Sequence, residues 1–253
     1  MTRIHHLNCV EIQSPMGGQA IGHCLLLEDK AGLALVDAGI GLLDVRQRET
    51  RLGNELIQMV GFILNEKQSA HYQIRQLGFD PADVRYCIAS HLDPDHIGGL
   101  ADFSRIALHV SEEEYKAFKG GNQRYLLHQV AGELPVRTYA PTNFLWQGLE
   151  ARKIEIGFES EIYLVPLPGH TVGHCGIAIL QERHWLFYIG DAYYYRVELE
   201  TNEHPVAQLA ASRAENNELR IESLEKIKAL VRTNPSIEVF SYHDPTEFPG
   251  NSI

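Results

Sequence analysis

The pattern of apolar and polar positions predicts that the chain opens with strands. Residues 21–29 and 31–39 are short apolar runs that end at Asp-Lys and at Gly, which is typical of two strands joined by a tight turn. Over residues 42–78 apolar and charged positions mix, a pattern compatible with two helices and a loop between them. Strands followed by helices imply layers in which helices cover the strands.

The pattern then repeats along the rest of the chain. Residues 84–90 predict a strand that runs into a polar cluster, and residues 104–111 predict another. Ser111 is placed to cap the next helix, with Glu114 completing a capping box. Further strands are expected at residues 152–156, 161–169, 175–182, 184–192 and 237–244, with an amphipathic helix over 217–233. Two strand-rich halves, each followed by helices, predict an α/β fold of the αββα sandwich type.

Composition limits the partners. The 253 residues carry 33 acidic against 22 basic side chains, a net charge of −11, with no local basic cluster, so neither nucleic acid nor an anionic membrane is expected as a partner. The first residues lack the apolar segment of a signal peptide, and no apolar run could span a bilayer, which favours a cytoplasmic protein. With no linker-like stretch, residues 1–253 are expected to form a single domain.

Four side chains able to bind metal fall within the run His-Leu-Asp-Pro-Asp-His at residues 91–96. At an extended strand end His91 and Asp93 project the same way, and after the turn at Pro94 the pair of Asp95 and His96 can face a neighbouring position. This spacing suits two adjacent metals. The alternative is that these are merely solvated loop residues, but a polar cluster directly after a buried strand favours binding.

Three more candidate ligands stand alone, each at the end of an apolar run. They are His170, Asp191 and His243. Strand ends on one edge of a sheet assembly can converge on one site even when they are far apart in the sequence. The repeated placement therefore adds these three residues to the predicted metal site.

The run HLDPDH, followed in order by PGHTVGH, GDA and SYHDP, resembles the metallo-β-lactamase superfamily over nearly the whole chain. The usual motif is H-x-H-x-D-H, so Asp93 stands where the family has histidine. The resemblance implies a four-layer αββα fold and Asp191 as a bridge between two metals. It implies one ligand set of His91, Asp93 and His170 and a second set of Asp95, His96 and His243. It also implies that Asp37 orients ligands without binding metal.

Asp93 changes the charge of such a site. Two divalent ions supply four positive charges and the three aspartates three negative ones, which leaves one positive charge where the histidine version leaves two. A bridging water should then be less acidic, and oxygen-rich ligation shifts preference from zinc towards manganese or iron. Two divalent ions are expected, zinc first among them. The alternative is that Asp93 only hydrogen-bonds its loop and the first site is weak or empty.

The segment Asp191-Ala192-Tyr193-Tyr194-Tyr195 is similar to the acyl-homoserine lactonase branch of the superfamily. In that branch Asp-Ala-x-Tyr places a phenol beside the metals, which implies this role for Tyr194. A helical insertion at about 42–78, LGFDPADV before the metal motif and the ending HDPTEF agree with the same branch. The alternative is that the tyrosines only line an aromatic wall.

The predicted activity is metal-assisted hydrolysis of a small-molecule lactone or other carboxylic ester. Asp95 would transfer a proton at the leaving oxygen, and Tyr194 would donate to the developing oxyanion. A thioesterase of the glyoxalase II kind, a di-iron oxidoreductase with a carboxylate in the same motif position, and a member that binds without turnover are the alternatives. The loops at 14–22 and 120–129 would shape the pocket but carry no readable pattern, so substrate and oligomeric state stay open.

Overall fold

The computed structural model describes residues 2–15, 18–130 and 134–249. Its larger sheet has the order β4-β1-β2-β3-β5-β6-β7, antiparallel from β4 through β3 and parallel from β3 through β7. The strands are β1 (Arg3–Gln13), β2 (Gln19–Asp29), β3 (Gly32–Val36), β4 (Phe62–Ile63), β5 (Val84–Ile88), β6 (Ala107–Ser111) and β7 (Val136–Tyr139).

The second sheet has the order β10-β11-β12-β13-β14, in which only the last pair is parallel. Its strands are β10 (Arg152–Lys153), β11 (Ile162–Pro166), β12 (Cys175–Gln181), β13 (His184–Tyr188) and β14 (Glu238–Phe240). A small hairpin of β8 (Leu145–Trp146) and β9 (Leu149–Glu150) precedes it. Buried side chains of both sheets, among them Leu25, Ile88 and Ile177, form one continuous core between them.

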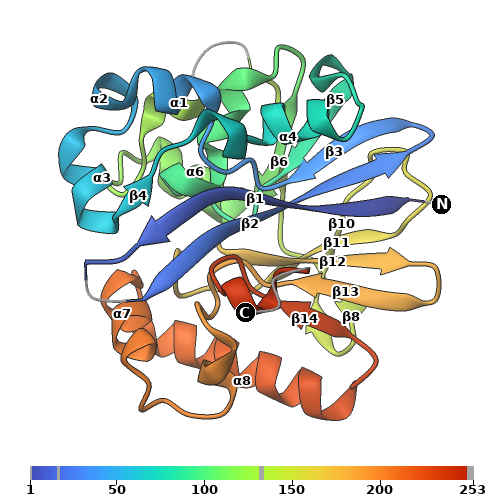
Figure 1. Ribbon diagram of the computed structural model, residues 1–253. Coiled ribbons are helices and arrows are strands. Elements are labelled where there is room, and N and C mark those ends of the chain that lie inside the picture. Colours follow the sequence, from blue (N-terminus) through green and yellow to red (C-terminus); the bar gives the residue numbers. More distant parts are fainter. Residues whose placement is uncertain (1, 16–17, 131–133, 250–253) are drawn as a thin grey trace.

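Helices cover the outer face of each sheet (Figure 1). Above the larger sheet lie α1 (Leu42–Arg46), α2 (Arg48–Arg51), α3 (Asn54–Val60), α4 (Ala70–Gln76) and α6 (Glu112–Lys119), and below the second lie α7 (Pro205–Arg213) and α8 (Asn217–Thr233). Leu224, Ile227 and Leu230 of α8 pack on the second sheet. The αββα prediction is confirmed. Among the described helices, none has both the length and the apolar character needed to cross a membrane.

The predicted pair of helices over residues 42–78 is wrong in detail. Four short helices form there, together with β4, which pairs with the edge of β1 through Glu11 and Ile63. Gly53 and Gly61 bound α3 with positive φ angles of 80° and 88°, a conformation that ends a helix. The chain is therefore divided into short pieces that wrap one corner of the larger sheet.

The predicted capping box at α6 is half right. The Ser111 hydroxyl accepts a hydrogen bond from the Glu114 backbone N–H at 3.1 Å, as an N-cap should. The Glu114 carboxylate does not return to the cap. It is buried and accepts instead from the Leu92 N–H at 2.9 Å and the Thr171 hydroxyl at 2.6 Å, which joins two loops of the candidate site.

Candidate metal centre

Parallel pairing of β13 and β14 brings Asp191 and His243 together. Tyr188 stands opposite Phe240 at the end of the pair, and each candidate ligand follows its strand by three residues. The predicted strand at 237–244 is shorter than expected, since β14 ends at Phe240 and His243 lies in the loop beyond. Parallel strands end at the same edge of a sheet, so both side chains reach the same place.

Glycines let the backbone turn directly before two candidate ligands. Gly169 precedes His170 with φ +135°, and a Cβ there would lie 2.1 Å from the Arg220 nitrogen. Gly190 precedes Asp191 with φ +53°, and a Cβ there would lie 2.7 Å from Nε2 of His174. Side chains other than hydrogen are excluded at both positions, which fixes where His170 and Asp191 point.

The loop after β5 supplies the other four candidates. Asp93 stands at the N-cap of the short helix α5 (Pro94–Ile97), yet its side chain makes no capping hydrogen bond. The carboxylate turns instead towards the loop's own His91, with Oδ2 at 3.3 Å from Nε2. His96 lies on α5 and is fully buried. One loop therefore contributes side chains to two adjacent positions.

We call His91, Asp93 and His170 the first group. Nε2 of His170 lies 3.2 Å from Oδ2 of Asp93 and 3.2 Å from Oδ2 of Asp191. The ligand atoms of His91, His170 and Asp191 all lie within 4.8 Å of one another. Ligands about 2.0–2.1 Å from a tetrahedral zinc stand about 3.3 Å apart, so these spacings fit a metal ion.

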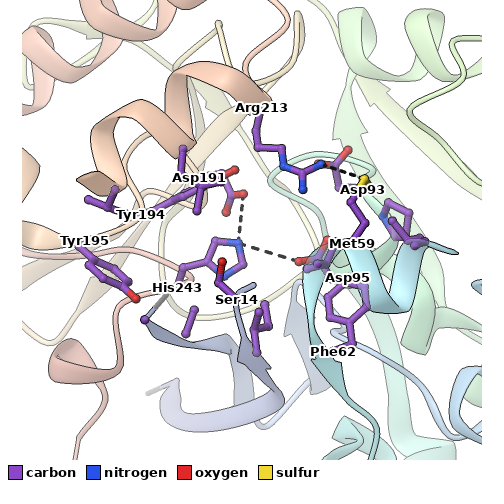
Figure 2. Close-up of a pocket in the computed structure, with 18 of the residues that line it drawn as sticks. Ser14, Met59, Phe62, Asp93, Asp95, Asp191, Tyr194, Tyr195, Arg213 and His243 are labelled. Atoms are coloured by element: carbon purple, nitrogen blue, oxygen red, sulfur yellow. Dashed lines mark hydrogen bonds and ion pairs between the residues drawn. The ribbon is translucent and has the colours of Figure 1, made fainter. Parts of the chain in front are cut away.

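We call Asp95, His96 and His243 the second group, and its ligand atoms also lie within 4.8 Å of one another. Asp191 touches this group through both oxygens, with Oδ1 at 3.3 Å from Nε2 of His96 and Oδ2 at 3.3 Å from Nε2 of His243. Figure 2 shows Asp191, His243 and Asp95 turned towards one another. The position of Asp191 between the groups is the position that a bridging ligand needs.

Hydrogen bonds behind the histidines aim their Nε2 atoms inward. The buried Asp37 carboxylate accepts from Nδ1 of His96 at 2.8 Å, and also from the Ser90 and Tyr188 hydroxyls. Nδ1 of His243 lies 3.0 Å from the backbone oxygen of Ile21. Such partners fix the tautomer and orientation of metal-binding histidines. The nearby His174 is engaged by the backbone at both ring nitrogens, since Nδ1 lies 2.9 Å from the Leu167 oxygen and Nε2 accepts from the Asp191 N–H at 3.0 Å.

Several inward-facing atoms lack hydrogen-bond partners within the described part of the chain. Nε2 of His91, Nε2 of His96 and Oδ1 of Asp191 are buried without a hydrogen bond. A buried polar atom left unpaired is costly, and a bound cation would satisfy all three. With four imidazoles and three carboxylates around them, these residues fit a pair of divalent metals. Their individual roles as ligands stay predictions.

The charges of the two groups respond differently to burial. Burial lowers the pKa of His91 well below its usual value. Burial acts the same way on His96, but the carboxylates of Asp191 and Asp37 outweigh it and raise that pKa well above the usual value. For Asp191, burial alone would raise the pKa, whereas His243, His96 and His170 bring it well below normal. These imidazoles therefore favour the carboxylate form of Asp191.

Arg124 is a site residue that the sequence did not predict. It lies in the loop at 120–129, which has no recognisable sequence pattern. Its guanidinium donates two hydrogen bonds to Asp93, from Nε to Oδ1 at 2.5 Å and from Nη2 to Oδ2 at 2.6 Å. Nη2 also lies 2.6 Å from Nε2 of His170. A basic residue in a polar loop gives no sequence signal of this contact, because the pairing depends on how the loop folds back.

The three consecutive tyrosines have separate surroundings. The Tyr193 hydroxyl donates to Glu247, and the Tyr195 hydroxyl donates to the backbone oxygen of Gln19. Tyr194 packs edge-on against His243 at a ring distance of 4.9 Å and lines the cavity. Burial, with the nearby Asp191 carboxylate, raises its pKa well above the usual value, so its phenol keeps its proton.

A cavity of about 810 Å³ opens onto the two groups. Asp93, Asp95, Asp191, Tyr194 and His243 line its polar end. Its other walls are largely apolar and come from β1, α3, β4 and α7, with Leu56, Met59, Phe62, Val206 and Leu209 among them. Figure 2 shows Phe62 next to Asp95, and Met59 next to Arg213. The cavity can hold a ligand with a polar head at the site and an apolar body.

Known proteins share this sequence pattern and fold. Residues 17–241 match the family model of the metallo-beta-lactamase superfamily. A probable metallo-hydrolase of Mycobacterium tuberculosis is 30% identical over 261 residues, which span 96% of this chain and 80% of that protein. An N-acyl homoserine lactonase of a Bacillus species is 29% identical over 224 residues, 87% of this chain and 80% of that protein.

A solved structure agrees at the level of the fold. An N-acyl homoserine lactone hydrolase, with its product N-hexanoyl-L-homoserine bound at the catalytic metal centre, matches with a TM-score of 0.75 at 22% identity. The match covers 96% of this chain and 94% of the other. The family model spans most of the sequence, and the two sheets carry the candidate ligands at one edge. The chain therefore belongs to the metallo-β-lactamase superfamily.

Proposed function

We propose that this protein is a hydrolase that opens a lactone or another carboxylic ester at a dinuclear metal centre. Tyr194 is the observation that carries the choice of substrate class, because a protonated phenol stands beside His243 at the polar end of a largely apolar cavity. Zinc is the first candidate metal because of the four imidazoles, and the three carboxylates also suit manganese or iron.

The seven candidate ligands would hold the metals, with Asp191 shared. Bound divalent metals ionise water near neutral pH and polarise an ester carbonyl. Asp37 keeps Nε2 of His96 pointed inward, and the backbone oxygen of Ile21 does the same for His243. The chain thus supplies a fixed set of donors before substrate arrives, which lowers the reorganisation that the reaction needs.

Asp95 is proposed to carry a proton to the leaving oxygen of the opened ester. Its Oδ2 lies 3.9 Å from Nε2 of His243, and it lines the cavity. Burial raises the pKa of Asp95, which makes its carboxyl group a better proton carrier than an exposed aspartate. The opened substrate needs one proton on its leaving oxygen, and a nearby carboxyl group can provide it.

Tyr194 is proposed to donate a hydrogen bond to the carbonyl oxygen as negative charge develops there. The apolar walls formed by α3 and α7 would hold the hydrocarbon part of the substrate. The Bacillus relative, named for N-acyl homoserine lactones, supports this class of compound. An acyl chain in the cavity would place the lactone ring at the polar end.

The test is a substrate panel on metal-loaded protein that contains lactones of different acyl length, thioesters, phosphodiesters and β-lactams. We expect a lactone to be the best substrate and Tyr194→Phe to lower kcat by about tenfold, less than a sole oxyanion donor would cost because the metals share that task. Tyr193→Phe is the matched control, since its hydroxyl bonds Glu247. Equal rates for wild type and Tyr194→Phe would contradict the assigned role.

The same panel separates the alternatives. A thioester preferred over every lactone would favour a thioesterase of the glyoxalase II kind. No hydrolysis of any panel substrate, together with redox activity of the iron-loaded protein in a separate assay, would favour the oxidoreductase. Metal binding without turnover of any substrate would favour a member that only binds. A single domain and a cytoplasmic location remain predictions from the sequence.

A further inference from the structure

Arg124 places a fixed positive charge at the edge of the first group. Its side chain is only 19% exposed, and the Asp93 side chain is 13% exposed. The two parallel hydrogen bonds between them, at 2.5 and 2.6 Å, have the bidentate geometry that makes an arginine–carboxylate pair strong. Nη1 of Arg124 donates to the backbone oxygen of Arg213 at 2.6 Å, so all three nitrogens are engaged.

The sequence neighbours of both members of the pair bond one buried carboxylate, that of Glu114. The Leu92 N–H, next to Asp93, and the Tyr125 hydroxyl, next to Arg124, each donate to Oε1 of Glu114 at 2.9 Å. The Arg124 N–H also bonds the Asn122 side chain at 3.0 Å. The fold therefore fixes the backbone on either side of the ion pair, which distinguishes it from a surface pair that forms and breaks freely.

The net charge of the Asp93–Arg124 pair differs from that of Asp93 alone. Asp93 alone would make the site one unit more negative than a site with histidine at this position. Arg124 returns that unit, so Asp93 and Arg124 together are neutral, as an imidazole ligand is. With Arg124 counted, the net charge no longer predicts a less acidic bridging water, whereas the preference of oxygen donors for manganese or iron is unchanged.

We propose that Asp93 and Arg124 act as one unit that replaces the histidine of the usual superfamily motif, with Arg124 as a positioning and charge-balancing residue. Oδ2 of Asp93 lies 3.3 Å from Nε2 of His91 and 3.2 Å from Nε2 of His170, which keeps it at ligand spacing while Arg124 neutralises it. The inference rests on the proposed metal centre and is independent of the substrate.

The proposal predicts a strong coupling between the two positions. Asp93→His alone restores the usual motif but leaves the Arg124 guanidinium without its carboxylate, 2.6 Å from His170 and beside the incoming metal. We therefore expect metal affinity in the first group to fall by about tenfold or more. Removing the guanidinium as well, in Asp93→His with Arg124→Gln, should restore affinity to within a few fold of wild type.

The experiment is a double-mutant cycle on metal-free full-length protein, in which zinc binding is measured by competition with a chelator of known affinity. Arg124→Gln alone should tighten zinc binding, because Asp93 then faces the metal uncompensated. Asp93→His with Arg213→Gln is the matched control: it removes an equal charge from the same cavity wall and should not rescue binding. Circular dichroism and thermal unfolding confirm that each variant is folded.

Additive effects would overturn the proposal, as would a double variant that binds no better than Asp93→His. Weaker zinc binding by Arg124→Gln would overturn the charge-balancing role, because the guanidinium would then only hold the carboxylate in place. Wild-type protein that binds no metal would also overturn it. Coupled zinc binding without lactone hydrolysis would sustain this inference and refute the proposed substrate, so the two failures are distinguishable.

Discussion

The first and second groups of candidate ligands balance their carboxylates in different ways. In the first group, a guanidinium that stays charged at every working pH faces Asp93. In the second group, His96 lies between Asp37 and Asp191, and these carboxylates raise its pKa so that a proton supplies the positive charge. A metal bound in the second group would displace that proton, whereas a metal bound in the first group would lie beside a permanent cation.

A sequence motif alone does not set the charge of a site. His91 and His96 belong to the same six-residue run, yet burial lowers one pKa and two carboxylates raise the other. We expect the second group to bind its metal more tightly near neutral pH. We expect the metal affinity of the first group to change with substitutions at Asp93 and Arg124.

Asp191→Ala should have the largest effect. Its two oxygens face His170, His96 and His243, so its loss removes a ligand from both groups. We expect both metals to be lost together and kcat/KM for the best lactone to fall by about 10³-fold or more. Elemental analysis of the purified variant measures the metals, and the loss of only one ion would instead make Asp191 a ligand of a single group.

Asp37→Asn should separate the groups. Asp37 has φ +52°, a conformation that asparagine also tolerates, so the backbone is retained. The neutral amide replaces the charged acceptor of His96, and we expect affinity in the second group to fall by about 10–100-fold with a smaller change in the first. Chelator competition resolves the two binding steps. Equal weakening of both steps would remove the distinction drawn here.

The pH dependence of metal binding should differ between the groups. His96 and His243 have raised pKa values, and a metal would displace their protons, so affinity in the second group should fall by up to about tenfold per pH unit for each displaced proton between pH 8 and pH 6. His91 has a lowered pKa and stays neutral over this range, so the first group should change less. Calorimetry in two buffers of different ionisation enthalpy counts the released protons. The step that Asp37→Asn weakens should release more of them.

Sequence patterns reach the parts of the site that follow strand ends. Asp191 and His243 stand directly after apolar runs, and the order of β13 and β14 needs only parallel pairing to join them. The five-stranded half and the long helix α8 follow from strong periodicity, and α8 spans Asn217–Thr233 as predicted. The four-layer αββα architecture was predicted from the resemblance of the whole chain to the superfamily.

Other features depend on tertiary contacts that no local pattern records. Arg124 is one basic residue in a polar loop until that loop folds against Asp93. Glu114 has the spacing of a capping box, but its buried carboxylate accepts hydrogen bonds from the Leu92 N–H and the Thr171 hydroxyl instead. The strand β1 was not predicted, because it has many polar residues and a register shift between Asn8 and Glu11 breaks its alternation, with Leu7 and Cys9 buried before the break and Val10 and Ile12 buried after it.

Stepwise metal titration of the metal-free protein, with lactone hydrolysis measured at each step, tests whether the two groups form a hydrolytic metal centre. We expect two ions per chain, the tighter one in the second group, with hydrolysis rising to its full rate only as the second ion binds. Full activity in metal-free protein, or a chain that binds two ions and opens no lactone or ester, would contradict this expectation.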